Sequence, residues 1–155
     1  MRKKAKRNSK ILLSIVSFLF LLGHPNLIAQ AYENAVGVKA GYSSGVVFKH
    51  FTDRDFALEG QALYNPLGFQ VTVLYEYQFT PHPKERLHYY FGGGIHSGNW
   101  ENEFALGVAA LAGSEYVFRK APLVLGLEWK PMFNIYKVSD FAIPDIALTV
   151  KVTLN

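Results

Sequence analysis

Residues 69–79, FQVTVLYEYQF, decide the fold class of this chain. Apolar side chains occupy the odd positions from Phe69 to Phe79 and polar side chains occupy the even positions, with Leu74 as the one exception. A period of two places successive side chains on opposite faces of an extended strand. The stretch therefore predicts a β-strand with one apolar face and one polar face.

The same period recurs along the rest of the chain. Residues 146–154 and 123–135 also alternate, and in the second stretch Pro131 falls on the apolar face. Because proline cannot donate to a strand ladder, Pro131 predicts a bulge or the end of regular pairing. Turn-forming residues separate the alternating stretches. We predict eight strands joined by short hairpin connections, at residues 35–43, 45–52, 56–64, 69–79, 87–98, 104–118, 122–135 and 144–154.

The first thirty residues have a different character. Residues 2–10 are basic, and Ile11–Gly23 is an apolar run of thirteen residues, shorter than the roughly 20 that a transmembrane helix needs. A basic segment, a short apolar segment and small residues at a cleavage site are typical of a secretory signal peptide, and the alternative is a buried helix of a soluble domain. We expect cleavage after Ala29, with cleavage after Ala31 as the rival. Residues 1–29 are then a signal peptide and residues 30–155 one mature domain.

Charge and composition exclude several classes of function. Six of the sixteen basic residues lie in the first ten positions, so the chain after residue 30 carries ten basic and twelve acidic groups. No basic patch remains to bind a nucleic acid. The absence of cysteine excludes a disulfide scaffold, a thiol enzyme and a cysteine-ligated metal. Gly92-Gly93-Gly94 lies within a strand pattern and indicates close packing, not a phosphate-binding loop, so we expect no cofactor.

An eight-stranded antiparallel meander can close in two ways. A soluble barrel encloses its apolar face, whereas a transmembrane barrel turns that face toward lipid and fills its lumen with polar side chains. The strand lengths suit a bilayer, which a tilted strand crosses in about 9–11 residues. Aromatic residues near the strand ends favour the membrane, because Tyr and Trp gather at its two surfaces. The predicted aromatic girdle consists of Tyr42, Tyr64, Phe69, Tyr77, Phe79, Tyr89, Tyr116, Phe118, Trp129 and Phe133.

The polar face carries few charges, and four lysines balance four glutamates. Such a balance suits a closed interior, because an unpaired buried charge is costly. Glycines on the same face would leave room for long polar side chains in a narrow barrel. We therefore predict an eight-stranded antiparallel up-and-down transmembrane β-barrel, with a soluble barrel as the alternative. The predicted lumen network consists of Lys39, Lys49, Glu59, Gln70, Glu76, His88, His96, Glu115, Glu128, Lys130 and Lys151.

Four stretches carry a resemblance to a known family: VGVKAGYSSGVVFKHF at 36–51, LYEY at 74–77, YFGGGIH at 90–96 and LEWKPMFN at 127–134. The chain resembles small eight-stranded outer-membrane barrels such as the OmpA transmembrane domain and OmpX, and more narrowly the short barrel proteins of Bacteroidetes-type bacteria. The resemblance implies export and insertion into the outer membrane by the barrel-assembly machinery. Such proteins often end in an aromatic assembly signal, whereas this chain ends TLN. We expect a monomer in contact with outer-membrane lipid.

The best candidate for chemistry is the neighbourhood of His96, Ser97, Glu101 and Glu103. Small outer-membrane barrels include lipid A deacylases and palmitoyltransferases, which place His, Ser and an acid near the membrane surface. A nucleophilic serine needs a base within hydrogen-bond reach. Adjacent strand residues point to opposite faces, so His96 and Ser97 meet only if the strand has already ended. His88 and His96 lie about 26 Å apart along one strand and cannot share a metal. We therefore predict no catalytic, cofactor-binding or metal-binding residue.

The expected function is structural. Side chains can fill the interior of an eight-stranded barrel, which disfavours a diffusion pore. We predict an integral outer-membrane protein with a closed, ion-paired lumen and a non-catalytic role in the envelope. The alternatives are a lipid A-modifying enzyme, a deacylase or an acyltransferase, and a soluble ligand-binding barrel. With both termini in the periplasm, Trp100 and Phe141 are candidate contact residues in the outward loops, which we expect at 43–45, 65–68, 97–103 and 136–144.

Overall fold

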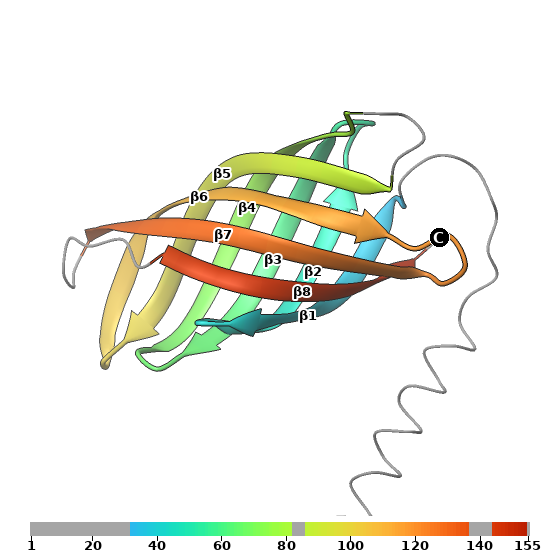
Figure 1. Cartoon of the computed structure of the whole chain (residues 1–155). Helices are drawn as coiled ribbons and strands as arrows, with labels where there is room; N and C mark the ends of the chain where they lie inside the picture. The colour runs from blue at the N-terminus through green and yellow to red at the C-terminus, as the bar shows by residue number, and fades with distance from the viewer. Residues whose placement is uncertain (1–31, 82–85, 137–143, 155) are drawn as a thin grey trace, which may run out of the picture.

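The computed structural model describes residues 32–81, 86–136 and 144–154, which form a closed barrel of eight strands (Figure 1). Each strand pairs antiparallel with the next, and β8 pairs with β1 to close the sheet. The predicted all-β, up-and-down fold is confirmed, and every strand lies within two residues of its predicted bounds. The strands are β1 (Asn34–Gly41), β2 (Ser44–Phe51), β3 (Phe56–Asn65), β4 (Gly68–Phe79), β5 (Leu87–Trp100), β6 (Glu103–Val117), β7 (Leu123–Tyr136) and β8 (Pro144–Leu154).

The alternation in β4 determines which face the barrel encloses. Gln70, Thr72 and Glu76 are fully buried, whereas the intervening residues Val71 and Val73 are 44% and 48% exposed. Leu74, the exception in the sequence pattern, belongs to the buried row and packs inside against apolar side chains of other strands. The barrel therefore encloses its polar face and exposes its apolar face.

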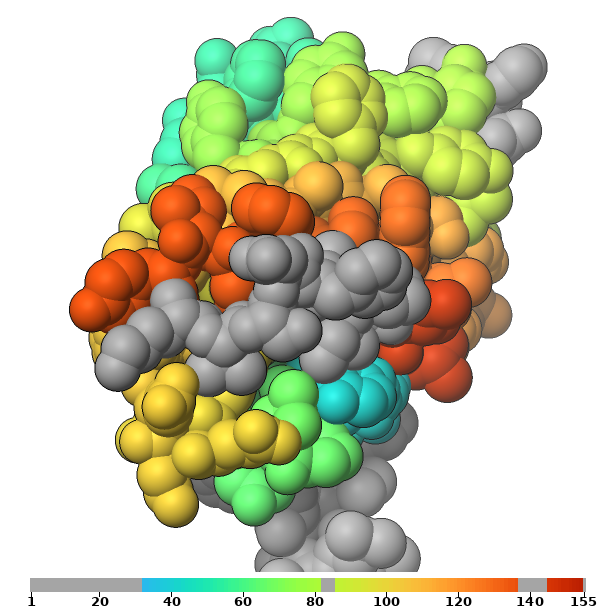
Figure 2. Space-filling view, turned by 90° about the vertical axis from the view of Figure 1, so that its left-hand side faces the viewer, coloured from blue at the N-terminus to red at the C-terminus, as the bar shows by residue number. Residues whose placement is uncertain are grey.

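The barrel has two ends, which we name by the residues that lie there. The terminal end carries Asn34 and Leu154, where β1 begins and β8 stops, and the far end carries the turns between β1 and β2, β3 and β4, and β5 and β6. Figure 2 looks onto the far end, where the turn after β3 (green) lies beside the turn after β5 (yellow). Backbone pairing between Gly68 and Trp100 joins these two turns.

The loop predicted at residues 97–103 is wrong. The β5–β6 ladder continues to the pair Trp100 and Glu103, so only Glu101 and Asn102 form the connection. Both have positive φ, 50° and 64°, the conformation that a two-residue hairpin of the I′ type requires. The polar composition of SGNW resembles a turn, but its side chains continue the strand alternation and Trp100 is buried at 4% exposure. Trp100 is therefore not a surface contact residue.

Pro131 marks the end of one ladder. On the β8 side the pairing stops at Pro131 and Pro144, as expected for a residue that cannot donate. The bulge lies elsewhere, between Leu106 and Gly107 of β6, where Leu106 pairs with Tyr136 but Gly107 pairs with Asn134. The extra residue on β7 is Ile135, four positions beyond the proline.

Glycines on the inner face fit the barrel for two different reasons. A Cβ on Gly107 would stand 2.6 Å from the His96 ring, and one on Gly113 would stand 2.5 Å from the Tyr90 ring, so these two positions leave room for large side chains. A Cβ on Gly94 would meet backbone alone, 2.8 Å from the Leu74 Cα on the next strand, and one on Gly107 would also overlap the Phe133 carbonyl oxygen. At Gly94 the glycine permits close approach of two backbones.

The described residues contain no helix that is long and apolar enough to cross a membrane. The predicted signal peptide, residues 1–29, and the candidate contact residue Phe141 lie outside the described residues.

Candidate functional site: the enclosed charge network

Charged side chains of the strands are almost all enclosed. Ten charged residues lie in the strands; Glu103, which begins β6 at the far end, is exposed, and the other nine are at most 2% exposed. Lys and Glu are rarely buried so completely unless they are paired. The predicted balance of four lysines against four glutamates omits Asp145, a fifth acid. The nine are Lys39, Lys49, Lys130, Lys151, Glu59, Glu76, Glu115, Glu128 and Asp145.

Five of these residues form a terminal charge cluster, defined as Lys49, Lys151, Glu59, Glu76 and Glu115. The Lys49 Nζ lies 2.9 Å from a Glu76 oxygen and 3.6 Å from a Glu115 oxygen. The Lys151 Nζ lies 3.3 Å from an oxygen of Glu59 and 3.3 Å from one of Glu115. Five different strands contribute one residue each, so closure of the barrel is what assembles the cluster.

The other four residues form a far charge cluster, defined as Lys39, Lys130, Glu128 and Asp145. Lys39 pairs with Glu128 and, at 3.0 Å, with Asp145. Lys130 lies 3.6 Å from the same Asp145 oxygen. Asp145 also accepts the backbone N–H of Ser43 at 3.2 Å, which ties the first turn of the far end to β8.

Gln61 on β3 joins the two clusters. Its amide nitrogen donates to Glu59 at 2.7 Å and to Glu128 at 3.3 Å, and its carbonyl oxygen accepts from Lys130 at 2.6 Å. Gln61 lies in the inward row of β3, and nothing in the sequence distinguishes it as a residue that connects two charge clusters. Through this amide, hydrogen bonds and ion pairs run without interruption from Glu115 to Asp145.

Tyr32 closes the network at the terminal end. This residue precedes β1, is 5% exposed, and donates its hydroxyl to Glu115 at 2.8 Å. Its ring meets Phe51 edge-to-face at a centroid distance of 5.3 Å and packs beside Ala35 and Val124. Burial and the neighbouring Glu115 carboxylate raise the pKa of the Tyr32 hydroxyl well above its ordinary value of about 10.

Tyr90 brings β5 into the interior. It is 2% exposed, and its ring centroid lies 4.4 Å from the Lys49 Nζ and 5.7 Å from the Lys151 Nζ, within the reach of a cation–π interaction. Tyr90 also packs in an enclosed apolar cluster with Leu74, Leu111 and Met132. The barrel interior therefore contains both the polar network and an enclosed apolar cluster.

Three predicted members of the network, His88, Gln70 and His96, form none of these ion pairs. His88 on β5 is half-buried and its Nδ1 lies 2.6 Å from the Thr80 hydroxyl. Gln70 on β4 donates to Thr72 at 2.8 Å and lies 3.1 Å from the Met132 sulfur. Both side chains make local contacts within the described residues.

The third such member, His96, lies toward the far end. Its Nε2 lies 2.8 Å from the Asn134 Oδ1, and its ring stacks on Trp100 at a centroid distance of 5.7 Å. His96 is 1% exposed, whereas the neighbouring Ser97 lies on the opposite, outer face. The structure therefore does not bring this histidine and serine together as a nucleophile and its base. The described residues contain no group of three or more His, Asp or Glu side chains that could hold a metal ion.

The outer surface carries the predicted aromatic girdle residues. Eight of them are 38–67% exposed and Tyr77 is half-buried; all nine lie toward the strand ends. Trp129, 50% exposed, lies midway along β7 rather than at its end. The sequence reading missed further exposed rings that lie beside the predicted ones: Phe56, Tyr75, Phe91, Phe104 and Tyr136.

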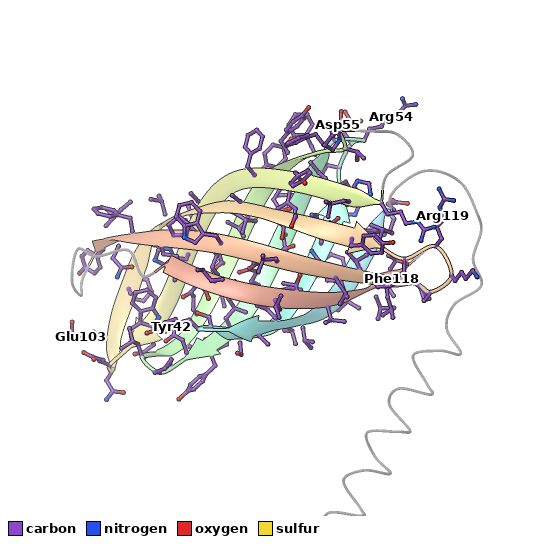
Figure 3. The ribbon with its side chains drawn as sticks, viewed as in Figure 1. Tyr42, Arg54, Asp55, Glu103, Phe118 and Arg119 are labelled. Carbon is purple, nitrogen blue, oxygen red and sulfur yellow. The ribbon has the colours of Figure 1, made fainter. Side chains whose placement is uncertain are left out.

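The labelled side chains of Figure 3 show where the exposed charges lie. Arg54, Asp55 and Arg119 project at the turns of the terminal end, and Glu103 and Tyr42 lie at the far end. Between the two ends, the described strands expose no charged side chain.

No protein-family model matches the chain, and no curated protein is a significant match.

Proposed function

We propose that the protein is an integral β-barrel of the outer membrane, with a lumen closed by ion-paired side chains and a structural, non-catalytic role in the envelope. The observation that carries this proposal is the inverted distribution of polarity. Nine charged side chains are enclosed, while the outer face exposes Val, Leu, Ile and aromatic side chains over every strand. In water this arrangement would expose the apolar face to solvent; in a bilayer it matches the polarity of each side.

The outer face also has the layers that a bilayer requires. An aromatic belt at the far end includes Tyr64, Phe69 and Phe104, and one at the terminal end includes Phe79 and Tyr116. Aliphatic side chains lie between the belts, among them Val38, Val46, Val73, Ile95, Val108, Leu127 and Leu148.

The spacing of the belts supports the same proposal. Phe69 and Phe79 lie on β4, one in each belt. Ten residues at about 3.4 Å each span about 34 Å along the strand, which a tilt of about 45° reduces to about 24 Å across the membrane. The apolar band of an outer-membrane barrel is about 25 Å tall.

The filled interior supports a structural role over a diffusion pore. Side chains from all eight strands meet inside, and the charged ones are paired across the lumen. An eight-stranded barrel has room for side chains but not for a water-filled channel beside them. The opposite orientation of His96 and Ser97 supports a non-catalytic role.

Fractionation of cells that express the full chain tests the proposal. We expect the protein in the outer-membrane fraction after carbonate extraction, with a gel mobility that changes on heating. Release into the supernatant would contradict the proposal and would favour a soluble ligand-binding barrel. N-terminal sequencing of the same material tests export, and we expect Gln30 as the first residue.

Mass spectrometry of lipid A tests the non-catalytic role. We expect the same acylation pattern in cells with and without the protein. A changed pattern would overturn this part of the proposal in favour of a lipid A-modifying enzyme.

A further inference from the structure

The two charge clusters differ in their balance. The far cluster holds two lysines and two acids, whereas the terminal cluster holds two lysines and three glutamates. All five residues of the terminal cluster are at most 1% exposed. If every group were ionised, the terminal cluster would enclose a surplus negative charge, which is costly away from water.

Within residues 32–81, 86–136 and 144–154, the side chains around the terminal cluster offer no further ammonium or guanidinium group. Besides its own members, the cluster faces Tyr32, Tyr90, Gln61, Gln78 and the half-buried His88, which pairs with Glu115 in the β5–β6 ladder. On β7, only Val124 and Gly126 point inward at this level, opposite Lys151 and Glu115. The two lysines are therefore the only ammonium groups among the described residues that face the three carboxyl groups.

The three carboxyl groups are not equivalent. Glu59 accepts hydrogen bonds from Gln61 at 2.7 Å and from Lys151 at 3.3 Å. Glu115 accepts from Tyr32 at 2.8 Å and lies within 3.6 Å of both lysines. Glu76 is fully buried, its one ion pair within 4 Å is with Lys49 at 2.9 Å, and neither of its oxygens accepts a hydrogen bond from an uncharged side chain among the described residues. Since hydrogen bonds to a carboxylate stabilise its charged form, Glu76 has the least support for a negative charge.

We propose that the terminal cluster is a binding site for one proton, held by the carboxyl group of Glu76 when the barrel is folded at neutral pH. Protonation leaves two lysines facing two carboxylates, the same balance as in the far cluster. A metal cation is a poorer fit, because each carboxyl group already lies 2.9–3.6 Å from an ammonium group that would repel it. The proposal depends on the closed barrel and not on membrane insertion.

A bound proton makes the closed lumen sensitive to pH. Glutamates in an unfolded chain titrate near pH 4.3, so above that pH the folded barrel binds one proton more than the unfolded chain. The free energy of unfolding then falls as the pH rises, until Glu76 releases its proton. In this interval the unfolding equilibrium constant rises by up to about tenfold per pH unit.

The test compares reversible unfolding of the wild type with that of two variants between pH 5 and pH 9. The protein is purified folded from cells, in detergent if it fractionates with membranes. Glu76→Gln keeps the shape of the side chain and removes the site, so we expect a weaker loss of stability with rising pH. Glu128→Gln is the matched control in the balanced far cluster, and we expect it to lower stability while it retains the wild-type pH dependence. Equal pH dependence in wild type and Glu76→Gln would overturn the proposal.

Infrared spectroscopy of the wild type, with ¹³C-labelled glutamate, gives a second readout that needs no variant to fold. We expect the C=O stretch of a protonated carboxyl group at pH 7 and its loss in Glu76→Gln. The absence of that band from the wild type would overturn the proposal. A change in the unfolding midpoint when sodium chloride is replaced by choline chloride would also overturn the proposal, because a bound sodium ion would then balance the surplus negative charge. Failure to fractionate with membranes would count against the proposed function alone.

Discussion

An arginine at position 73 distinguishes a lipid-facing surface from a water-facing one. Val73 is 48% exposed on the outer face, at the middle of β4, and pairs with Gly60 and Ile95. The space above Gly60 is open, since a Cβ there would meet nothing within 4 Å. Val73→Arg therefore adds charge without a clash, and its cost comes from the surroundings of the barrel.

The expected cost depends on depth in the membrane. Position 73 is less than one residue from the midpoint of Gly68–Phe79, so the arginine would lie near the midplane, where it costs about 2–4 kcal/mol. Asn99 on β5 is exposed beside Phe69 and Phe104 in the far-end belt, and Asn99→Arg should cost about 0–1 kcal/mol. On a surface in water, both changes would stay within about 0.5 kcal/mol.

Urea unfolding of the protein in phospholipid vesicles measures both variants, with the heat-dependent gel shift as the readout of the folded fraction. We expect a clearly lower free energy of unfolding for Val73→Arg and a small change for Asn99→Arg. Equal, small effects at the two positions would refute the assignment of the outer face to lipid.

Three further predictions concern the interior. Gly94→Ala places a Cβ 2.8 Å from the backbone of the neighbouring strand and should lower the free energy of unfolding by about 1–3 kcal/mol. Gly60→Ala, where the space is open, should change it by no more than about 0.5 kcal/mol. Thermal gel-shift curves compare the two variants, and similar curves would contradict the packing argument. Lys39→Met leaves the two acids of the far cluster facing Lys130 alone. In urea titrations, the free energy of unfolding should fall by about 3–5 kcal/mol. An unchanged unfolding midpoint would mean that the far cluster is not closed to water. Because the pKa of Tyr32 is raised, the folded state keeps a proton that the unfolded chain loses, so the free energy of unfolding falls as the pH rises above about 10. In alkaline unfolding curves, Tyr32→Phe should show a weaker fall. An identical fall in both proteins would contradict the burial of this hydroxyl.

The strands were predictable because their alternation is strong and their connections are short. In β4 and β8, every residue of the outward row is apolar, so the approximate strand bounds and the assignment of side chains to the two faces follow from the sequence alone. The end of β5 was not predictable in this way. Ser97-Gly98-Asn99 has the composition of a turn, and only its ladder with β4 and β6 makes it strand.

The enclosed residues were predictable as a set, but their partners were not. Asp145 could have been found by extending the inward row of β8 two residues before Ala147. The pairing of Lys49 with Glu76, or of Lys39 with Asp145, depends on the stagger of strands around the closed barrel, which no single strand encodes. The contact of Tyr32 with Glu115 was not predictable from strand alternation, because Tyr32 lies in the segment before β1.

The two tryptophans of the chain allow the most direct test of the membrane assignment. Trp129 is 50% exposed at the middle of β7, whereas Trp100 is 4% exposed inside the far end. In vesicles of phosphatidylcholine brominated on its acyl chains, we expect strong quenching of fluorescence in Trp100→Phe, which retains the outer tryptophan. Trp129→Phe, which retains the enclosed one, should be quenched weakly. Equal quenching of both variants, or quenching of neither, would contradict a barrel whose apolar face contacts lipid.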